Sequence, residues 1–196
     1  MKYQTILLFG PPGAGKGTWG NILTQIPGMY HFASGDMFRA LDPNSESGKM
    51  VLECISRGEL VPDEQAMALW REQMKRLVEF GDFKIDEHYL VLDGLPRTQH
   101  QAEMAEDDLE VRMILFLDCQ DRDILVKRLY GRALIEHRHD DANEETIRHR
   151  FEVYDQRVQD TLTYYPKHSI RMIDVSQSAQ KILLDISRSL VEGLGK

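Results

Sequence analysis

The chain has 196 residues, of which 42% are hydrophobic, and its formal net charge is −8. This length accommodates one well-packed core, and we expect residues 1–196 to form a single domain. An acidic chain disfavours nucleic acid as a partner, because phosphate backbones are bound by basic surfaces. The two cysteines, Cys54 and Cys119, lie far apart in the sequence, so neither a disulfide framework nor a cysteine zinc site is indicated.

The N-terminal region shows no export or membrane signal. Its apolar stretch is four residues long, Ile6 to Phe9, and no cleavage pattern follows it. A transmembrane helix needs about 20 apolar residues. We therefore expect a cytoplasmic protein without a membrane partner.

The first predicted strand, Thr5 to Phe9, ends in a glycine-rich stretch, and a helical pattern begins at Trp19. The stretch reads Gly10-Pro11-Pro12-Gly13-Ala14-Gly15-Lys16-Gly17-Thr18. Glycines allow successive backbone N–H groups to turn inward, the helix N-terminus adds a positive end, and Lys16 can reach the outer phosphates. A plain turn joining a strand to a helix is the alternative, but the strand-loop-helix context favours a loop that binds a nucleoside triphosphate.

Short apolar runs then alternate with helical segments, which predicts an α/β fold of three layers, with a parallel sheet between helices. The five expected strands are Thr5 to Phe9, Tyr30 to Ala33, Tyr89 to Asp93, Arg112 to Asp118 and Ile170 to Asp174. Ligands bind at the carboxyl ends of such strands. Two stretches interrupt the alternation, 34–61 and 131–141, and we expect both to be excursions from a core formed by 1–33, 62–130 and 142–196.

Two helices can be read from their apolar positions. The segment from Asp141 to Tyr165 is predicted as one helix, with Asp141 and Glu144 as a capping box. Its apolar stripe consists of Ile147, Phe151, Tyr154, Val158, Leu162 and Tyr165. A second set at helical spacing, which we assign to the core, consists of Met67, Trp70, Met74 and Leu77.

Four further motifs accompany the glycine-rich loop. They are Ser34-Gly35-Asp36-Met37-Phe38-Arg39, Gly58-Glu59-Leu60-Val61-Pro62-Asp63-Glu64, Asp93-Gly94-Leu95-Pro96-Arg97-Thr98 with Gln101, and the stretch from Arg132 to Asp141. In this combination the chain resembles the adenylate kinase family, from the first strand to the last helix. The resemblance implies a phosphate-loop fold with a small helical excursion that binds the nucleoside monophosphate, and with a short lid.

The resemblance also implies roles for individual residues. ATP would be held by Gly13, Ala14, Gly15, Lys16, Gly17, Thr18, Arg128 and Arg132. AMP would be held by Ser34, Arg39, Glu59, Leu60, Val61, Gly94, Leu95, Pro96, Arg97, Gln101, Arg138 and Arg150. The catalytic cations would be Lys16, Arg97, Arg132, Arg138 and Arg150. Mg²⁺ would arrive with ATP, and Asp93 would hold its water ligands, with Asp36 assisting.

The implied activity is reversible phosphoryl transfer from MgATP to AMP, giving two ADP, by a monomer. Arginine suits this chemistry because its planar fork binds phosphate oxygens without losing its charge. A UMP/CMP kinase is the first alternative. Ser34 and Thr98 argue against it, since relatives of that specificity usually carry Ala and Asn at those places. A nucleotide-binding regulatory protein without transfer activity is the second alternative, and the complete set of arginines argues against that one.

The predicted lid is short, because only five residues separate Arg132 from Arg138. This leaves no room for the long hairpin that some relatives stabilise with zinc. The nearby residues His137, His139, Asp140, Asp141 and His149 resemble a metal-binding cluster. Since capping explains the aspartates and a His-x-His pair does not define a tetrahedral site, we expect no zinc site. Ala142 reads as a one-residue insertion that shifts the register of Arg150.

Overall fold

The computed structural model of the protein describes residues 1–136, 141 and 143–195. Its strands form one parallel sheet in the order β2-β3-β1-β4-β5. Their bounds are β1 Tyr3–Phe9, β2 Met29–Ala33, β3 Tyr89–Asp93, β4 Leu109–Asp118 and β5 Ile170–Asp174. The five predicted strands are thus confirmed. β4 begins three residues before its prediction, because Glu110 and Arg112 alternate with apolar residues there and hide the strand from a search for continuous apolar runs.

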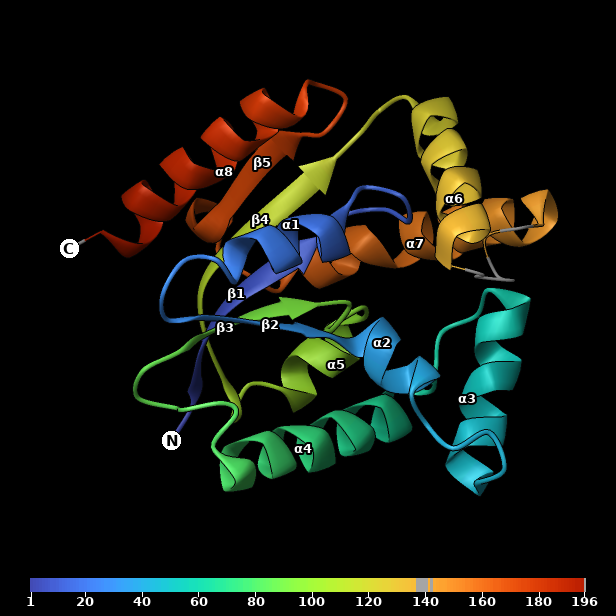
Figure 1. Cartoon of the computed structure of the whole chain (residues 1–196), viewed down its shortest axis with the longest axis horizontal. Helices are drawn as coiled ribbons and strands as arrows, with labels where there is room; N and C mark the ends of the chain where they lie inside the picture. The colour runs from blue at the N-terminus through green and yellow to red at the C-terminus, as the bar shows by residue number, and fades with distance from the viewer. Residues whose placement is uncertain (137–140, 142, 196) are drawn as a thin grey trace.

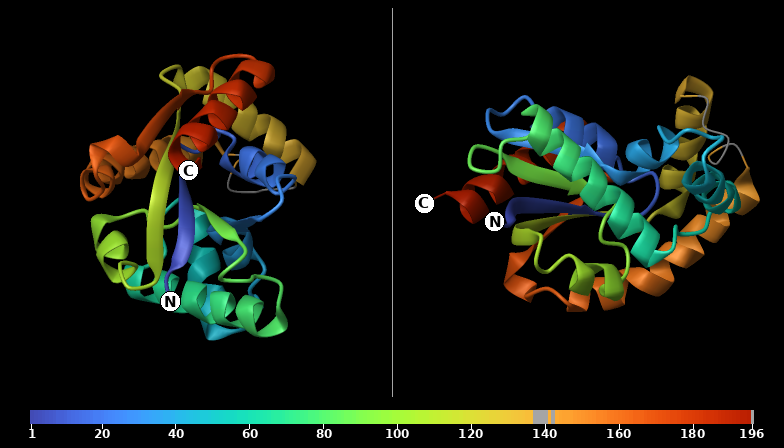
Figure 2. Two further views of the ribbon diagram at one scale, coloured as in Figure 1. Left: turned by 90° about the vertical axis from the view of Figure 1, so that its left-hand side faces the viewer. Right: turned by 90° about the horizontal axis from the view of Figure 1, so that it is seen from below.

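Helices cover both faces of the sheet (Figures 1 and 2), which confirms the three-layer α/β/α prediction. Their bounds are α1 Lys16–Leu23, α2 Ser34–Arg39, α3 Glu46–Arg57, α4 Asp63–Phe80, α5 Gln99–Met104, α6 Arg122–Glu136, α7 Glu144–Thr163 and α8 Ala179–Leu194, with a short 3₁₀ turn at Lys167–Ser169. Successive residues of β1 point to opposite faces, as strand geometry requires. Leu7 packs with Trp70 and Met74 of α4, whereas Ile6 packs with Leu23 of α1 and with α6 and α8.

The first interruption in the alternation, 34–61, contains α2 and α3, which project beyond the sheet on one side of the molecule (Figure 1). Ser45 caps α3, because its hydroxyl accepts a hydrogen bond from the Gly48 amide at 3.0 Å. Gly58 ends the helix at a φ of +74°, a conformation that favours glycine. The chain then returns to the core at α4. The second interruption, 131–141, begins inside α6, which continues to Glu136.

The start of α7 corrects the sequence prediction. The helix begins at Glu144, and its cap is Asn143, whose side-chain oxygen accepts from the Glu145 amide at 2.8 Å. Asp141 forms no capping box, because its carboxylate is fully buried and pairs with two arginines instead. The apolar stripe is confirmed, with Ile147, Phe151, Val158 and Tyr165 buried and with Tyr154 and Leu162 partly buried. The predicted core positions Met67, Trp70 and Met74 are fully buried as well.

Within the described part of the chain, no helix combines the length and the apolar content that crossing a membrane requires. The predicted lid is only partly described, since Arg138 and Ala142 lie outside the described residues, as do His137, His139 and Asp140. The expectations for these five residues therefore stay predictions.

Candidate functional site

The loop between β1 and α1 takes a conformation that only glycine permits at its tightest points. Gly13 has a φ of +81°, and a Cβ there would lie 2.8 Å from the Leu125 carbonyl oxygen. Gly10 approaches β4 so closely that a Cβ would lie 2.4 Å from the Leu117 carbonyl oxygen. Gly15 ends the loop at a φ of +85° and directly precedes α1. The loop thus wraps around the N-terminus of a helix, which is the geometry of an anion-binding site.

Lys16 is the first residue of α1, and its side chain reaches back into this loop. Its Nζ donates to the carbonyl oxygens of Gly10 at 2.7 Å and of Pro11 at 3.1 Å. Burial lowers the pKa of Lys16 to about 8, and the nearby Asp93 carboxylate opposes this shift. Neighbouring arginines lower the pKa further, namely Arg97, Arg132 and Arg150. Cations from four separate elements therefore share one electrostatic environment, which favours the binding of a polyanion.

Arg97 extends this group of cations toward the excursion. It follows the turn after β3, and its Nε donates to the Gly94 carbonyl oxygen at 2.7 Å. Burial lowers its pKa, and Asp93 opposes this effect, while Arg150 and Arg39 lower the pKa further. Arg39, at the end of α2, pairs with Asp36 at 2.6 Å. A phosphate group bound between these guanidinium groups would relieve their mutual repulsion.

Asp141 joins two of the predicted phosphate-binding arginines. Its carboxylate is fully buried, and Oδ2 accepts from Nε of Arg132 at 2.6 Å. Oδ1 accepts from Nη1 of Arg150. The end of α6 and the second turn of α7 are thereby tied through one carboxylate. This role cannot be read from the sequence, because adjacent aspartates before a helix are also the signal for a cap.

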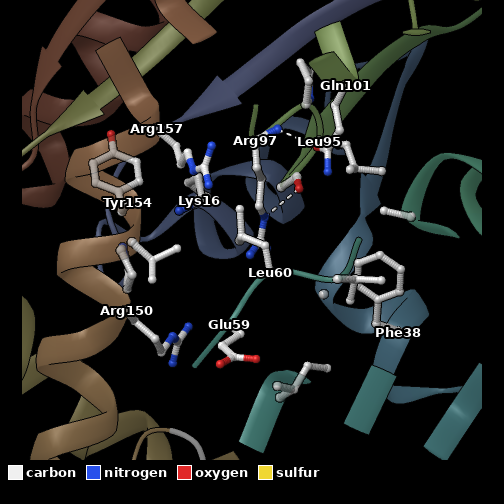
Figure 3. A pocket seen from close by; sticks show the side chains of 18 of the residues that line it. Lys16, Phe38, Glu59, Leu60, Leu95, Arg97, Gln101, Arg150, Tyr154 and Arg157 are labelled. Carbon is white, nitrogen blue, oxygen red and sulfur yellow. Dashed lines mark hydrogen bonds between the residues drawn. The ribbon is translucent and has the colours of Figure 1, made fainter. Parts of the chain in front are cut away.

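One pocket collects most of the predicted acceptor residues (Figure 3). The predicted site residues in its wall are Lys16, Arg39, Glu59, Leu60, Val61, Gly94, Leu95, Pro96, Arg97, Gln101 and Arg150. Residues of the wall that were not predicted for the site include Phe38 and, on α7, Val153, Tyr154 and Arg157. The three on α7 belong to the same helix face as Arg150 at intervals of three and four residues, and this spacing was the signal that could have revealed them. The phosphate loop and the acceptor segment thus border a single cavity.

Other predicted residues lie elsewhere. Ser34 is fully buried behind the pocket wall and is not among the lining residues, and its hydroxyl has no hydrogen-bond partner among the described residues. It lies so close to Gly94 that a Cβ on that glycine would be 2.4 Å from the Ser34 oxygen. Arg128 donates from Nη2 to the Val175 carbonyl oxygen at 2.7 Å, after β5. Arg138 lies outside the described residues.

The residues present fit a magnesium ion that a nucleotide carries in. Asp93 ends β3 beside the phosphate loop, with Oδ2 about 4.0 Å from the position of a Cβ on Gly17. The described residues contain no group of three or more His, Cys, Asp or Glu side chains that could enclose a metal. Mg²⁺ suits this arrangement, because it typically keeps several waters and binds through one or two carboxylates and the phosphates of a substrate.

These features together define a nucleotide-binding protein of the phosphate-loop class. A family model described as adenylate kinase matches residues 8–170. Among similar proteins, an adenylate kinase of Thermobifida fusca is 37% identical over 84% of this chain and 86% of its own length. An adenylate kinase of Thermotoga petrophila is 32% identical over 95% and 96% of the two chains. A uridylate kinase of Saccharomyces cerevisiae is 32% identical over 98% and 93%.

The match covers most of the chain, so the protein belongs to the adenylate kinase family. It is accordingly a nucleotide-binding phosphotransferase of the nucleoside monophosphate kinase class.

Proposed function

We propose that this protein catalyses the reversible transfer of a phosphoryl group from MgATP to AMP, giving two ADP. The observation that carries the proposal is the shared pocket, in which Lys16 and the phosphate loop form one side and Gln101 and residues 58–61 form the other. Arg97 and Arg150 line the same pocket. Two nucleotides bound from opposite sides would bring their phosphates together at these cations.

The chemistry needs positioning and positive charge more than a base. In the transition state, negative charge is spread over the three equatorial oxygens of the transferred phosphoryl group, and fixed cations stabilise that charge. Lys16, Arg97 and Arg150 are held by backbone or carboxylate partners before any substrate binds. The acceptor is already a phosphate anion, since the second pKa of a phosphomonoester is about 6. No side chain therefore has to remove a proton.

Asp93 is the residue we assign to magnesium, through the water ligands of the ion. When bound, the ion neutralises charge on the donor phosphates. In the free protein Asp93 lies near Lys16 and Arg97, whose positive charges it partly offsets. Asp36 pairs with Arg39, so an additional role for it at the metal competes with that ion pair.

The two excursions, 34–61 and 131–141, are proposed to close over the substrates and to exclude water that would otherwise hydrolyse ATP. Arg39 and Glu59 of the first excursion line the same pocket as Arg150 and Arg157 of α7, so its closure would enclose a ligand bound there. We propose that Ser34 and Arg138 complete the AMP site, and that Arg128 serves the donor nucleotide. The enzyme would act as a cytoplasmic monomer.

A kinase for UMP or CMP is the second candidate, because the similar protein from Saccharomyces cerevisiae is named uridylate kinase. Gln101 favours adenine, because its amide offers both a donor and an acceptor to the edge of the base, and the apolar residues Phe38, Leu60 and Val61 line the same pocket. A regulatory protein without transfer activity is the third candidate. It is disfavoured because Lys16, Arg39, Arg97 and Arg150 all line one pocket.

A coupled assay of ADP formation distinguishes these candidates. ATP is supplied as the donor, with AMP, UMP, CMP or GMP as the acceptor in parallel reactions. Fastest turnover of AMP supports the proposal, whereas fastest turnover of UMP or CMP assigns the second candidate. Absence of turnover with every acceptor, in protein that still binds ATP, would assign the third.

A further inference from the structure

A carboxylate outside the predicted site residues holds the side chain of Gln101. Asp63, the first residue of α4, accepts from Nε2 of Gln101 at 2.8 Å through Oδ1. Its Oδ2 accepts from the Thr98 hydroxyl at 2.7 Å. The backbone amide of Arg97 donates to Oε1 of Gln101 at 2.7 Å. Both ends of the Gln101 amide are therefore bonded within the protein, and the side chain is 1% exposed.

The partners fix which way the amide points. A carboxylate offers only acceptors and a backbone N–H only donates, so Nε2 must face Asp63 and Oε1 must face Arg97. The orientation of Asp63 is determined in turn. Thr98 accepts from the backbone amide of Gln101 at 3.0 Å, and this leaves its own hydrogen for the carboxylate. The position of Asp63 at the N-terminus of α4 also favours its negative charge.

This orientation leaves Gln101 with one N–H on Nε2 and one lone pair on Oε1 for a ligand in the pocket that it lines. Adenine offers the matching edge, since its ring N1 accepts and its 6-amino group donates. Hypoxanthine is almost the same shape, but its N1–H donates and its 6-oxygen accepts. In one binding pose the two bases therefore require opposite orientations of the amide.

We propose that Asp63 is a positioning residue that sets the base preference of the acceptor site, by fixing the Gln101 amide in the orientation that accepts 6-amino purines and rejects 6-oxo purines. This inference rests on the proposed function, because it requires the pocket to hold the base of a purine monophosphate. It assigns Asp63 no contact with substrate. The residue acts through Gln101.

The first test uses the unmodified protein and three acceptors that differ only at the edge of the base. They are AMP, purine riboside monophosphate, which has N1 but no 6-substituent, and IMP. If the amide is fixed, kcat/KM should be highest for AMP, lower for purine riboside monophosphate and lowest for IMP. Purine riboside monophosphate lacks one of the two hydrogen bonds to Gln101, and IMP places a donor against the Nε2 donor and an acceptor against the Oε1 acceptor. IMP used as well as AMP would overturn the inference without any variant being made.

The second test compares Asp63→Asn with Glu64→Gln. Each variant removes one negative charge from the first turn of α4. Among the described residues, Glu64 makes no hydrogen bond to Gln101, and its Oε1 lies 3.6 Å from Nε2 of His100. In Asp63→Asn the new amide offers a donor as well as an acceptor, so only the backbone amide of Arg97 still opposes the reversed orientation of Gln101. The ratio of kcat/KM for AMP to that for IMP should fall about tenfold, the size expected for one hydrogen bond to a charged group.

Glu64→Gln should leave this ratio unchanged, and the KM for ATP should be unchanged in both variants. A purely structural role for Asp63 would lower turnover of AMP and IMP together, with a constant ratio, and that result would overturn the inference. Failure of the proposed function is a different outcome, because it is seen as a preference of the unmodified protein for UMP or CMP.

Discussion

Replacement of Asp141 by asparagine tests whether the buried carboxylate organises the cations of the site. Removal of one partner from a buried ion pair costs ~3–5 kcal/mol. Here the side chains of Arg132 and Arg150 remain 29% and 21% exposed, so water compensates part of the loss. We therefore expect the free energy of unfolding to fall by ~2 kcal/mol. For a chain of this length that corresponds to a fall in Tm of about 4–8 °C.

The assay is urea unfolding of the nucleotide-free protein, with kcat/KM measured in parallel. Glu144→Gln is the matched control, since Glu144 pairs with Arg148 on the exposed face of α7, where the side chains are 56% and 70% exposed. Such an exposed pair contributes little to stability, because water screens it. Equal unfolding midpoints for Asp141→Asn and Glu144→Gln would refute the reasoning. Activity should fall in Asp141→Asn alone, because both arginines lose the partner that orients them.

Three further predictions concern the site itself. Arg97→Ala should reduce kcat by about 10²–10³-fold while ATP binding measured by calorimetry survives, because the guanidinium acts on the charge that develops during transfer; undiminished kcat would contradict the assignment. Lys16→Met should abolish transfer and should also flatten the pH dependence of stability. Because burial lowers the Lys16 pKa from 10.5 to about 8, the unfolded chain binds more protons between these values, and the unmodified protein should gain stability over the variant as pH rises through that window. A parallel shift of the urea midpoints of both proteins would be evidence against a buried ammonium. Chelation of Mg²⁺ with EDTA should stop ADP formation, and excess Mg²⁺ should restore it; full activity in EDTA would exclude the role of Asp93.

The parallel sheet was predictable because strands that are buried on both faces have continuous apolar sequences. β1 and β3 have such runs, and their predicted and observed positions agree to within two residues. The start of β4 was not predictable in this way, since its first residues alternate between apolar and charged. The start of α7 was mistaken for another reason. Asp141 and Asn143 are both good caps by residue type, and only the tertiary position of Arg132 and Arg150 decides which of them turns inward.

The site was predictable where a motif is local and was missed where partners are distant in sequence. The phosphate loop is a contiguous stretch whose glycines have positive φ or close backbone contacts, and this can be inferred from spacing alone. The contact of Asp63 with Gln101 spans 38 positions, and no pattern in either segment indicates it. The role of Arg157 was not predictable either. The apolar residues of α7 have the period of a core helix, and this period indicates nothing about the charged residues between them.

α7 places folding residues and pocket residues in the same turns of one helix. Phe151 belongs to the core, Arg150, Tyr154 and Arg157 line the pocket, and Val158 does both. A substitution scan along this helix would therefore yield few variants that lose activity and keep stability. α2 and α3 contribute fewer residues to the core. Substitutions that change the acceptor preference without loss of stability should consequently accumulate in residues 34–61. Substitutions in α7 should be tolerated least.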